Sequence, residues 1–162
     1  MGNFFVADGA ALTSENDKWT TPRNLFAQLN SEFKFNLDAA ALSNSALCEN
    51  WYGPDHPDES RRDALTRNWV EDSEGKAIFL NPPYGKDMKR WMSKADMESR
   101  GGGLVVCLLP SRTDTAWWWD HCMHYEIRFI RGRLKFGGGK QSAPFASAIV
   151  VMRVVDNPGV TG

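Results

Sequence analysis

Apolar positions along the chain predict strands that alternate with helices. Two stretches, residues 22–33 and 86–99, repeat apolar residues at the spacing of an amphipathic helix. Others have the length and the apolar or alternating pattern of strands: residues 33–38, 77–80, 104–109, 126–130 and 145–155. Strands that alternate with helices favour an α/β domain, in which a central, mostly parallel sheet is finished by an antiparallel hairpin.

Particular residues mark where these elements begin and end. Thr21 and Pro22 suit the N-cap and the first position of a helix, and residues 110–114 are placed to cap a helix that contains three tryptophans, residues 117–119. Three consecutive tryptophans cannot all face inward, so we expect at least one to be exposed. Residues 43–62 read as a long loop with room for one short strand near residues 46–51.

The length of the chain, 162 residues, has room for one domain. Residues 1–17 lack a sustained period and residues 156–162 resemble a frayed end, so we expect a flexible arm, a domain over residues 18–155 and a flexible tail. No apolar run approaches the roughly 20 residues of a membrane span, and the first residues lack the pattern of a signal peptide. These features favour a cytoplasmic protein without a membrane partner.

Charge and cysteine content narrow the possible chemistry. The formal net charge is −1, so any binding of nucleic acid has to come from a local basic face. Cys48, Cys107 and Cys122 are widely spaced and odd in number, which argues against a disulfide framework. The cluster His121-Cys122-x-His124 has no second Cys/His group at ligand spacing, so we expect no metal site.

The stretch Ile78-Phe79-Leu80-Asn81-Pro82-Pro83-Tyr84-Gly85 carries the clearest candidate chemistry. A buried strand that stops at two prolines ends in a stiff turn, because each proline has a fixed φ and donates no backbone hydrogen bond. At the carboxyl end of a strand, Asn81 Oδ1 and the Pro82 carbonyl can accept from the two N–H bonds of a planar amino group, and Tyr84 can stack on a base. A turn that merely ends a strand is the alternative.

Asn-Pro-Pro-Tyr resembles the signature of S-adenosylmethionine-dependent amino methyltransferases. A series of blocks in order resembles the phage-type DNA N6-adenine methyltransferase (Dam-like) family over about residues 18 to 152. The blocks are Trp19-Thr20-Thr21-Pro22, Leu37-Asp38-Ala39-Ala40-Ala41, Asp63-Ala64-Leu65, Asn81-Pro82-Pro83-Tyr84-Gly85, Leu109-Pro110-Ser111-Arg112-Thr113-Asp114 and Arg131-Gly132-Arg133-Leu134-Lys135-Phe136. Several blocks in order are far more specific than one motif, and the resemblance implies a Rossmann-like methyltransferase domain.

The resemblance implies S-adenosylmethionine as cofactor and a set of residues that hold it. The Trp19-Thr20-Thr21-Pro22 turn is expected near the methionine end, where Asp38, followed by the small Ala39 and Ala40, can pair with the ammonium group. Asp63 is expected to face the adenosine part, with Ala64 and Leu65 lining its adenine, and Asn81 is also expected among the residues that bind the cofactor. The chain lacks the Gly-rich turn that many amino methyltransferases have after the first strand, so a solvated aspartate at a strand end is the alternative for Asp38.

The concentrated basic segment of the chain follows the strand at residues 126–130. It carries Arg131, Arg133, Lys135 and Lys140 with a run of glycines, and no acid occurs between Glu126 and the last strand. Such a segment suits a phosphate backbone, and we expect it to contact double-stranded DNA together with Lys86 and Arg112. An ordinary solvated hairpin is the alternative.

These expectations combine into an enzymatic hypothesis: transfer of a methyl group from S-adenosylmethionine to the N6 amino group of an adenine flipped out of DNA. The resemblance suggests a phage protein that shields DNA from restriction. Cytosine N4, adenine in RNA and the glutamine side chain in proteins present similar planar amino groups, so they remain alternative substrates. A nucleic-acid binding protein without catalytic activity is an alternative from another class.

Overall fold

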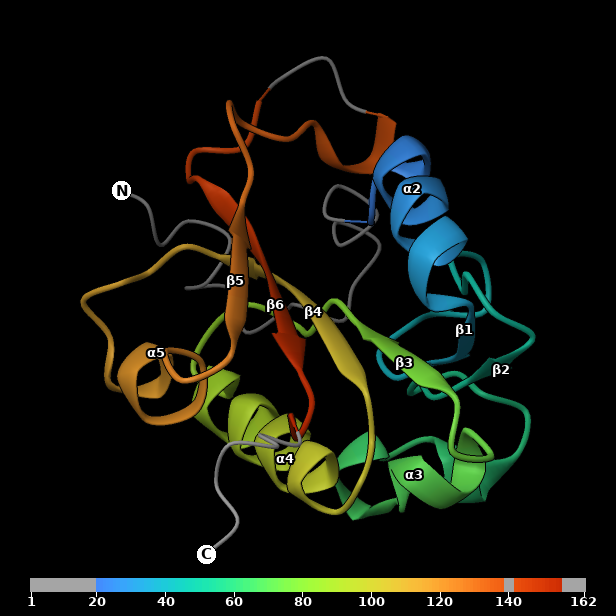
Figure 1. Cartoon of the computed structure of the whole chain (residues 1–162). Coiled ribbons are helices and arrows are strands. Elements are labelled where there is room, and N and C mark those ends of the chain that lie inside the picture. The colour runs from blue at the N-terminus through green and yellow to red at the C-terminus, as the bar shows by residue number, and fades with distance from the viewer. Residues whose placement is uncertain (1–19, 139–141, 156–162) are drawn as a thin grey trace, which may run out of the picture.

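A six-stranded mixed sheet forms the centre of the computed structural model, which describes residues 20–138 and 142–155 (Figure 1). Its strands are β1 (Phe35–Asp38), β2 (Asn50–Trp51), β3 (Ala77–Leu80), β4 (Val105–Pro110), β5 (Glu126–Phe129) and β6 (Ser147–Met152). They lie in the order β2-β1-β3-β4-β6-β5. Neighbours from β2 to β4 are parallel, whereas β6 is antiparallel to both β4 and β5. The architecture is α/β, and it is compatible with a methyltransferase fold.

The helices are α2 (Arg23–Phe33), α3 (Trp69–Asp72), α4 (Met88–Arg100) and α5 (Ala116–His121), with short 3₁₀ turns η2 (Glu59–Arg61), η3 (Ala64–Thr66) and η4 (Phe136–Gly138). Figure 1 shows α2 beside β1, apart from α3, α4 and α5 at the lower end of the view. Phe26 of α2 packs on Phe35 and Phe79, with ring centroids 5.5 and 5.3 Å away. Strands β3, β4 and β6 are buried along their whole length, so the core lies around the middle of the sheet.

The predicted elements are largely confirmed. The run 77–80 is β3 to the residue, the helix expected over 86–99 is α4, and the short strand expected in the long loop is β2. Trp117 and Trp118 are buried whereas Trp119 is 61% exposed, as three consecutive tryptophans require. Of the described helices, none has the length and apolar character to cross a membrane.

Several element ends differ from the prediction, among them those of the last strand, which spans Ser147–Met152 and not residues 145–155. The first strand begins at Phe35, not at 33, because Phe33 still belongs to α2 and Lys34 ends that helix in the left-handed conformation, at φ 58°. Pro22, not Thr21, occupies the N-cap of α2, without a side-chain hydrogen bond. Residues 110–114 do not cap α5 either: its N-cap is Thr115, whose hydroxyl donates to the Arg112 carbonyl. The Thr21 hydroxyl oxygen instead accepts a hydrogen bond from the side chain of Asn81.

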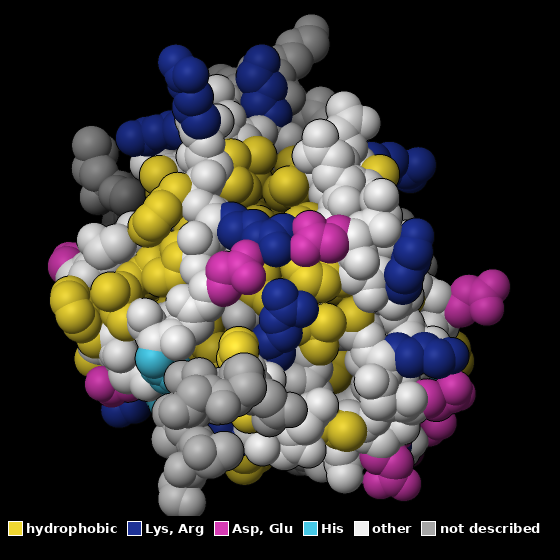
Figure 2. Space-filling view, viewed as in Figure 1, with side chains coloured by type: hydrophobic (Ala, Val, Ile, Leu, Met, Phe, Trp, Pro, Cys, Tyr) yellow, Lys and Arg dark blue, Asp and Glu magenta, His cyan; other side chains and the backbone are white. Residues whose placement is uncertain are grey.

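A long connection joins β5 to β6 and carries the predicted basic segment. Figure 2 shows Lys and Arg side chains standing out at the top of the face, over this connection. Arg131, Arg133 and Lys135 are exposed there. The connection is tied back to the domain, because the Gly137 amide donates to the Thr20 carbonyl (2.9 Å) and the Ala143 amide to the Leu134 carbonyl (2.8 Å). Lys140 lies outside the described residues, as do Trp19, the predicted arm at 1–17 and the predicted tail at 156–162.

Candidate active site

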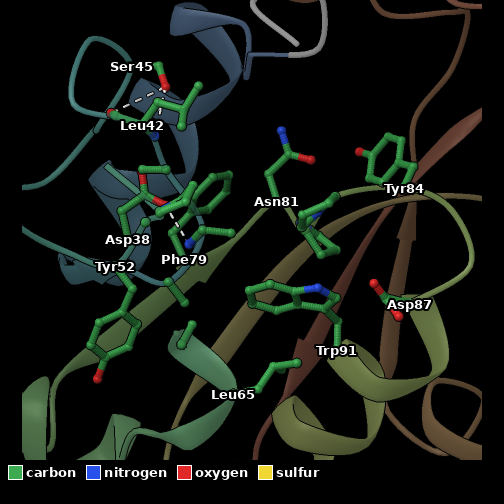
Figure 3. A pocket seen from close by; sticks show the side chains of 18 of the residues that line it. Asp38, Leu42, Ser45, Tyr52, Leu65, Phe79, Asn81, Tyr84, Asp87 and Trp91 are labelled. Carbon is green, nitrogen blue, oxygen red and sulfur yellow. Dashed lines mark hydrogen bonds between the residues drawn. The ribbon is translucent and has the colours of Figure 1, made fainter. Parts of the chain in front are cut away.

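A cavity of about 330 Å³ opens at the carboxyl ends of β1 and β3 (Figure 3). This is the edge at which ligands bind in open α/β sheets. The predicted site residues that line it come from separate blocks of the sequence: Thr20, Thr21, Asp38, Ala39, Ala40, Asp63, Ala64, Leu65, Asn81, Pro82, Pro83, Tyr84 and Lys86. Pro22, Arg112, Arg131, Arg133 and Lys135 are described but do not line the cavity. The fold therefore brings together the residues expected for cofactor and chemistry and leaves most of the expected DNA contacts outside.

Asp38 ends β1 with its carboxyl group buried, at 2% exposure. Its two oxygens accept from backbone amides of the following loop: Oδ1 from Ala40 (3.3 Å) and Oδ2 from Leu47 (3.1 Å). Burial disfavours the charged form and raises the pKa of Asp38 to about 7, while these two hydrogen bonds oppose that rise. The carboxyl group is thus held in one place and is sensitive to a nearby charge, because it ionises close to neutral pH.

Asn81 follows β3 and stands between Asp38 and Tyr84 (Figure 3). Its Nδ2 donates to the Thr21 hydroxyl oxygen at 3.1 Å. Thr21 is buried just before α2, so the start of that helix fixes the amide of Asn81 instead of being capped by Thr21. With Nδ2 engaged in this way, the other amide atom, Oδ1, is the acceptor that the side chain can present to a ligand.

Tyr84 is only 7% exposed, although it lines the cavity. Its hydroxyl donates to the Leu108 carbonyl at 3.2 Å. Its ring meets Phe136 and Phe145 edge to face, with centroids 6.4 and 5.6 Å away. Burial raises the pKa of Tyr84 well above its ordinary value, so the hydroxyl stays protonated. Tyr84 therefore links the Asn-Pro-Pro-Tyr turn to the connection that carries the basic segment.

The turn at residues 63–65 forms another wall of the cavity. Asp63 caps η3, because its Oδ1 accepts from the Leu65 amide at 3.1 Å. The fully buried Trp69 donates its indole N–H to the Ala64 carbonyl at 2.8 Å. These two hydrogen bonds hold the acid and its apolar neighbours at fixed positions beside the cavity.

Some lining residues were not predicted from the sequence. Trp91 repeats with Met88, Met92 and Ala95 at helical spacing, which indicates a core position, yet its indole reaches the cavity from α4. Asp87, before α4, also lines it, as do Leu42 and Ser45 in the loop after Asp38. Their closeness to the motif in the sequence could have pointed to two of them, because Asp87 and Trp91 lie within two helical turns of Asn-Pro-Pro-Tyr.

Within residues 20–138 and 142–155, no group of three or more His, Cys, Asp or Glu side chains could hold a metal ion. His121, the last residue of α5, is bound to Asp96 of α4, with Nδ1 2.8 Å from Oδ2. As expected, the His121-Cys122-x-His124 cluster lies at a helix end, where Cys122 is the C-cap.

Sequence comparison identifies the class of protein that this fold and cavity represent. The family model for DNA N-6-adenine-methyltransferase (Dam) matches residues 9–158, so the chain belongs to that family. The resemblance seen in the sequence blocks is thereby confirmed. Over 102 residues, 62% of this chain, it is also 32% identical to the DNA N-6-adenine-methyltransferase of Escherichia phage T1. The matched stretch spans 39% of that relative's length.

Proposed function

We propose that this chain is an S-adenosylmethionine-dependent methyltransferase that methylates the N6 amino group of adenine in double-stranded DNA. One observation carries the proposal: Asp38, Asp63 and Asn81, from three separate blocks, line one cavity at the carboxyl edge of the sheet. In this proposal residues 18–155 form a Rossmann-like methyltransferase domain. Membership of the Dam family supports this substrate over cytosine, RNA or protein glutamine.

The residues that line the cavity suit the successive parts of S-adenosylmethionine, from the methionine group to the adenine. Asp38 suits the ammonium of the methionine part, because a buried carboxylate gains a strong charge-assisted contact from a cation. The small side chains of Ala39 and Ala40 let the ligand come close to the backbone. Asp63 suits the hydroxyl groups of the ribose, and Ala64 and Leu65 offer apolar contact to the adenine. When bound, the sulfonium supplies an already activated methyl group.

Asn81 and the Pro82 carbonyl are proposed to act on the target amino group. The lone pair of an exocyclic amine is delocalised into the ring, which makes it a poor nucleophile. Two acceptors on its N–H bonds favour a tetrahedral nitrogen and stabilise the positive charge that develops there as the methyl arrives. The hydrogen bond from Asn81 to Thr21 prepares the amide for this task, because it leaves Oδ1 as the acceptor.

Tyr84 is proposed to hold the flipped base, and the connection after β5 to hold the DNA backbone. The edge-to-face contacts of the Tyr84 ring with Phe136 and Phe145 hold it against the connection that carries Arg131, Arg133 and Lys135. The proposed base contact and the proposed backbone contacts therefore lie in parts of the chain that pack on each other. Lys86, which is exposed at the cavity, and Arg112 complete the proposed DNA contacts.

One experiment tests the proposal directly. The protein is incubated with S-adenosylmethionine and unmethylated DNA, the DNA is digested to nucleosides, and the methylated nucleoside is identified by mass and retention time. We expect N6-methyldeoxyadenosine, and far less of it from Asn81→Ala in the same incubation time. Detection of N4-methyldeoxycytidine would instead identify cytosine as the methylated base. Binding of cofactor and DNA without any methylated product would instead favour a protein that binds nucleic acid without catalysis. If confirmed, a role in shielding phage DNA from restriction in the host cytoplasm follows as the next hypothesis.

A further inference from the structure

Trp91 stands apart from the other apolar residues of α4. Met88, Met92 and Ala95 are almost fully buried in the core, at 3%, 0% and 0% exposure, whereas Trp91 is only partly buried and lines the cavity. Figure 3 shows the indole beneath Asn81, with Leu65 below it. A large, flat, apolar surface therefore lies at the Leu65 side of the cavity, next to the small or aliphatic side chains of Ala64 and Leu65.

The surroundings of Trp91 hold the indole in place. Its ring packs against Trp69, with centroids 6.3 Å apart. Trp69 is fully buried and donates to the Ala64 carbonyl, so the two indoles and the turn at residues 63–65 form one connected unit. The backbone amide of Trp91 donates to the Asp87 carbonyl in the first turn of α4. A ring fixed in this way loses little conformational entropy when it contacts a ligand.

We propose that Trp91 is a specificity-determining residue that binds the purine ring of the cofactor. The proposal rests on the proposed function and assigns the apolar end of the cavity, between Trp91 and Leu65, to the adenine of S-adenosylmethionine. A purine is planar and polarizable, and contact with an indole favours it over a smaller or non-planar group. The target adenine is expected at Asn81 and Tyr84, on the other side of the turn, because its amino group has to reach the acceptors there.

Calorimetry with S-adenosylhomocysteine, in the absence of DNA, tests this assignment. We expect Trp91→Ala to weaken binding roughly tenfold, in line with other base–aromatic contacts, and Trp91→Phe to weaken it less because a planar ring is retained. Trp119→Phe, which changes a tryptophan that is 61% exposed and does not line the cavity, is the matched control and should bind normally. Thermal unfolding of each variant without ligand reports any loss of packing separately.

Intrinsic fluorescence adds a measurement that a purely structural role would not change. S-adenosylhomocysteine should alter the emission of the wild type and of Trp119→Phe, and most of that change should be absent in Trp91→Phe. If Trp91→Ala binds the ligand normally, or Trp91→Phe retains the full change, the assignment is wrong. An effect on the KM for DNA alone would place the indole against the target base and also overturn it. Failure of the wild type to bind S-adenosylhomocysteine would overturn the proposed function itself.

Discussion

The cavity and the basic connection after β5 hold their polar side chains in opposite ways. In the cavity, Asp38 accepts two backbone hydrogen bonds and Asn81 is fixed by Thr21. In the connection, Arg131 and Lys135 are exposed, and Arg133 donates to the Ala143 carbonyl at the long distance of 3.5 Å. Chemistry on one amino group benefits from acceptors that need no rearrangement, whereas a phosphate backbone can be followed by long side chains that adapt. Changes in the two regions should therefore have separable effects.

The largest effect is expected at Asn81. Asn81→Ala removes one prearranged acceptor, which in comparable electrostatic sites costs on the order of 10²–10³ in rate, while binding of cofactor and DNA should persist. Asn81→Asp is the matched variant. Its carboxylate accepts the same hydrogen bond, can receive one from the Thr21 hydroxyl, and balances the developing positive charge, so it should retain substantial activity. Single-turnover methylation, measured beside cofactor affinity, decides this. Near-normal turnover of Asn81→Ala would mean that the Asn-Pro-Pro-Tyr turn is structural.

The next effect should appear in DNA affinity alone. Replacing Arg131, Arg133 and Lys135 together with alanine should weaken binding to all sequences alike. If each contacts one phosphate, the salt dependence should become shallower by up to about 2.7 in the slope of log K against log salt. Salt titrations by fluorescence anisotropy measure this, and S-adenosylhomocysteine binding should be unchanged.

A control with the same change in charge makes that test specific. Lys34, Lys76 and Arg153 are exposed at the opposite edge of the sheet, before β1, before β3 and after β6. Their triple alanine variant should bind DNA almost as the wild type does. If both triple variants lose the same affinity, overall charge accounts for the effect and the connection is an ordinary surface.

The pH dependence of cofactor binding should come from the cavity. The pKa of Asp38 is raised to about 7, so its carboxyl group is mostly protonated at pH 6 and mostly ionised at pH 7.5. In the proposed site the ionised form pairs with the ammonium of the ligand, so S-adenosylhomocysteine should bind roughly tenfold more weakly at pH 6 than at pH 7.5. In Asp38→Asn, affinity should be low at both pH values, and the difference should disappear. The same pH dependence in Asp38→Asn would assign it to another group.

The sequence predicts those features of the fold and the cavity that depend on local signals, and it misses those that depend on packing between elements. Strand β3 was predicted to the residue because four apolar residues end at two prolines, both local signals. The start of β1 was predicted at the wrong residue, because the alternating pattern continues back into the last turn of α2. Only the left-handed conformation of Lys34 separates the helix from the strand. Asp38, Asp63 and Asn81 were identifiable through their blocks. Trp91 could not be identified as a cavity residue, because its spacing matches that of the core residues of α4. Which of these residues reaches the cavity depends on how the helix is rotated against the sheet.

The smallest effect is expected at Thr21, which contacts Asn81 but is not proposed to touch the reacting atoms through its side chain. Thr21→Val keeps the shape and removes the acceptor for Asn81 Nδ2, so the amide is less well oriented. Loss of one such hydrogen bond should lower the single-turnover rate by about two- to tenfold. Thr21→Ser retains a hydroxyl and should react almost normally. Because Thr21 acts through Asn81, Thr21→Val should add little to the loss already caused by Asn81→Ala. Two results would contradict this role: losses that multiply in the double variant, or a loss of S-adenosylhomocysteine binding by Thr21→Val as large as its effect on transfer. The Thr21 side chain would then contact the cofactor directly. The start of α2 would belong to the binding surface and would not position the Asn81 amide.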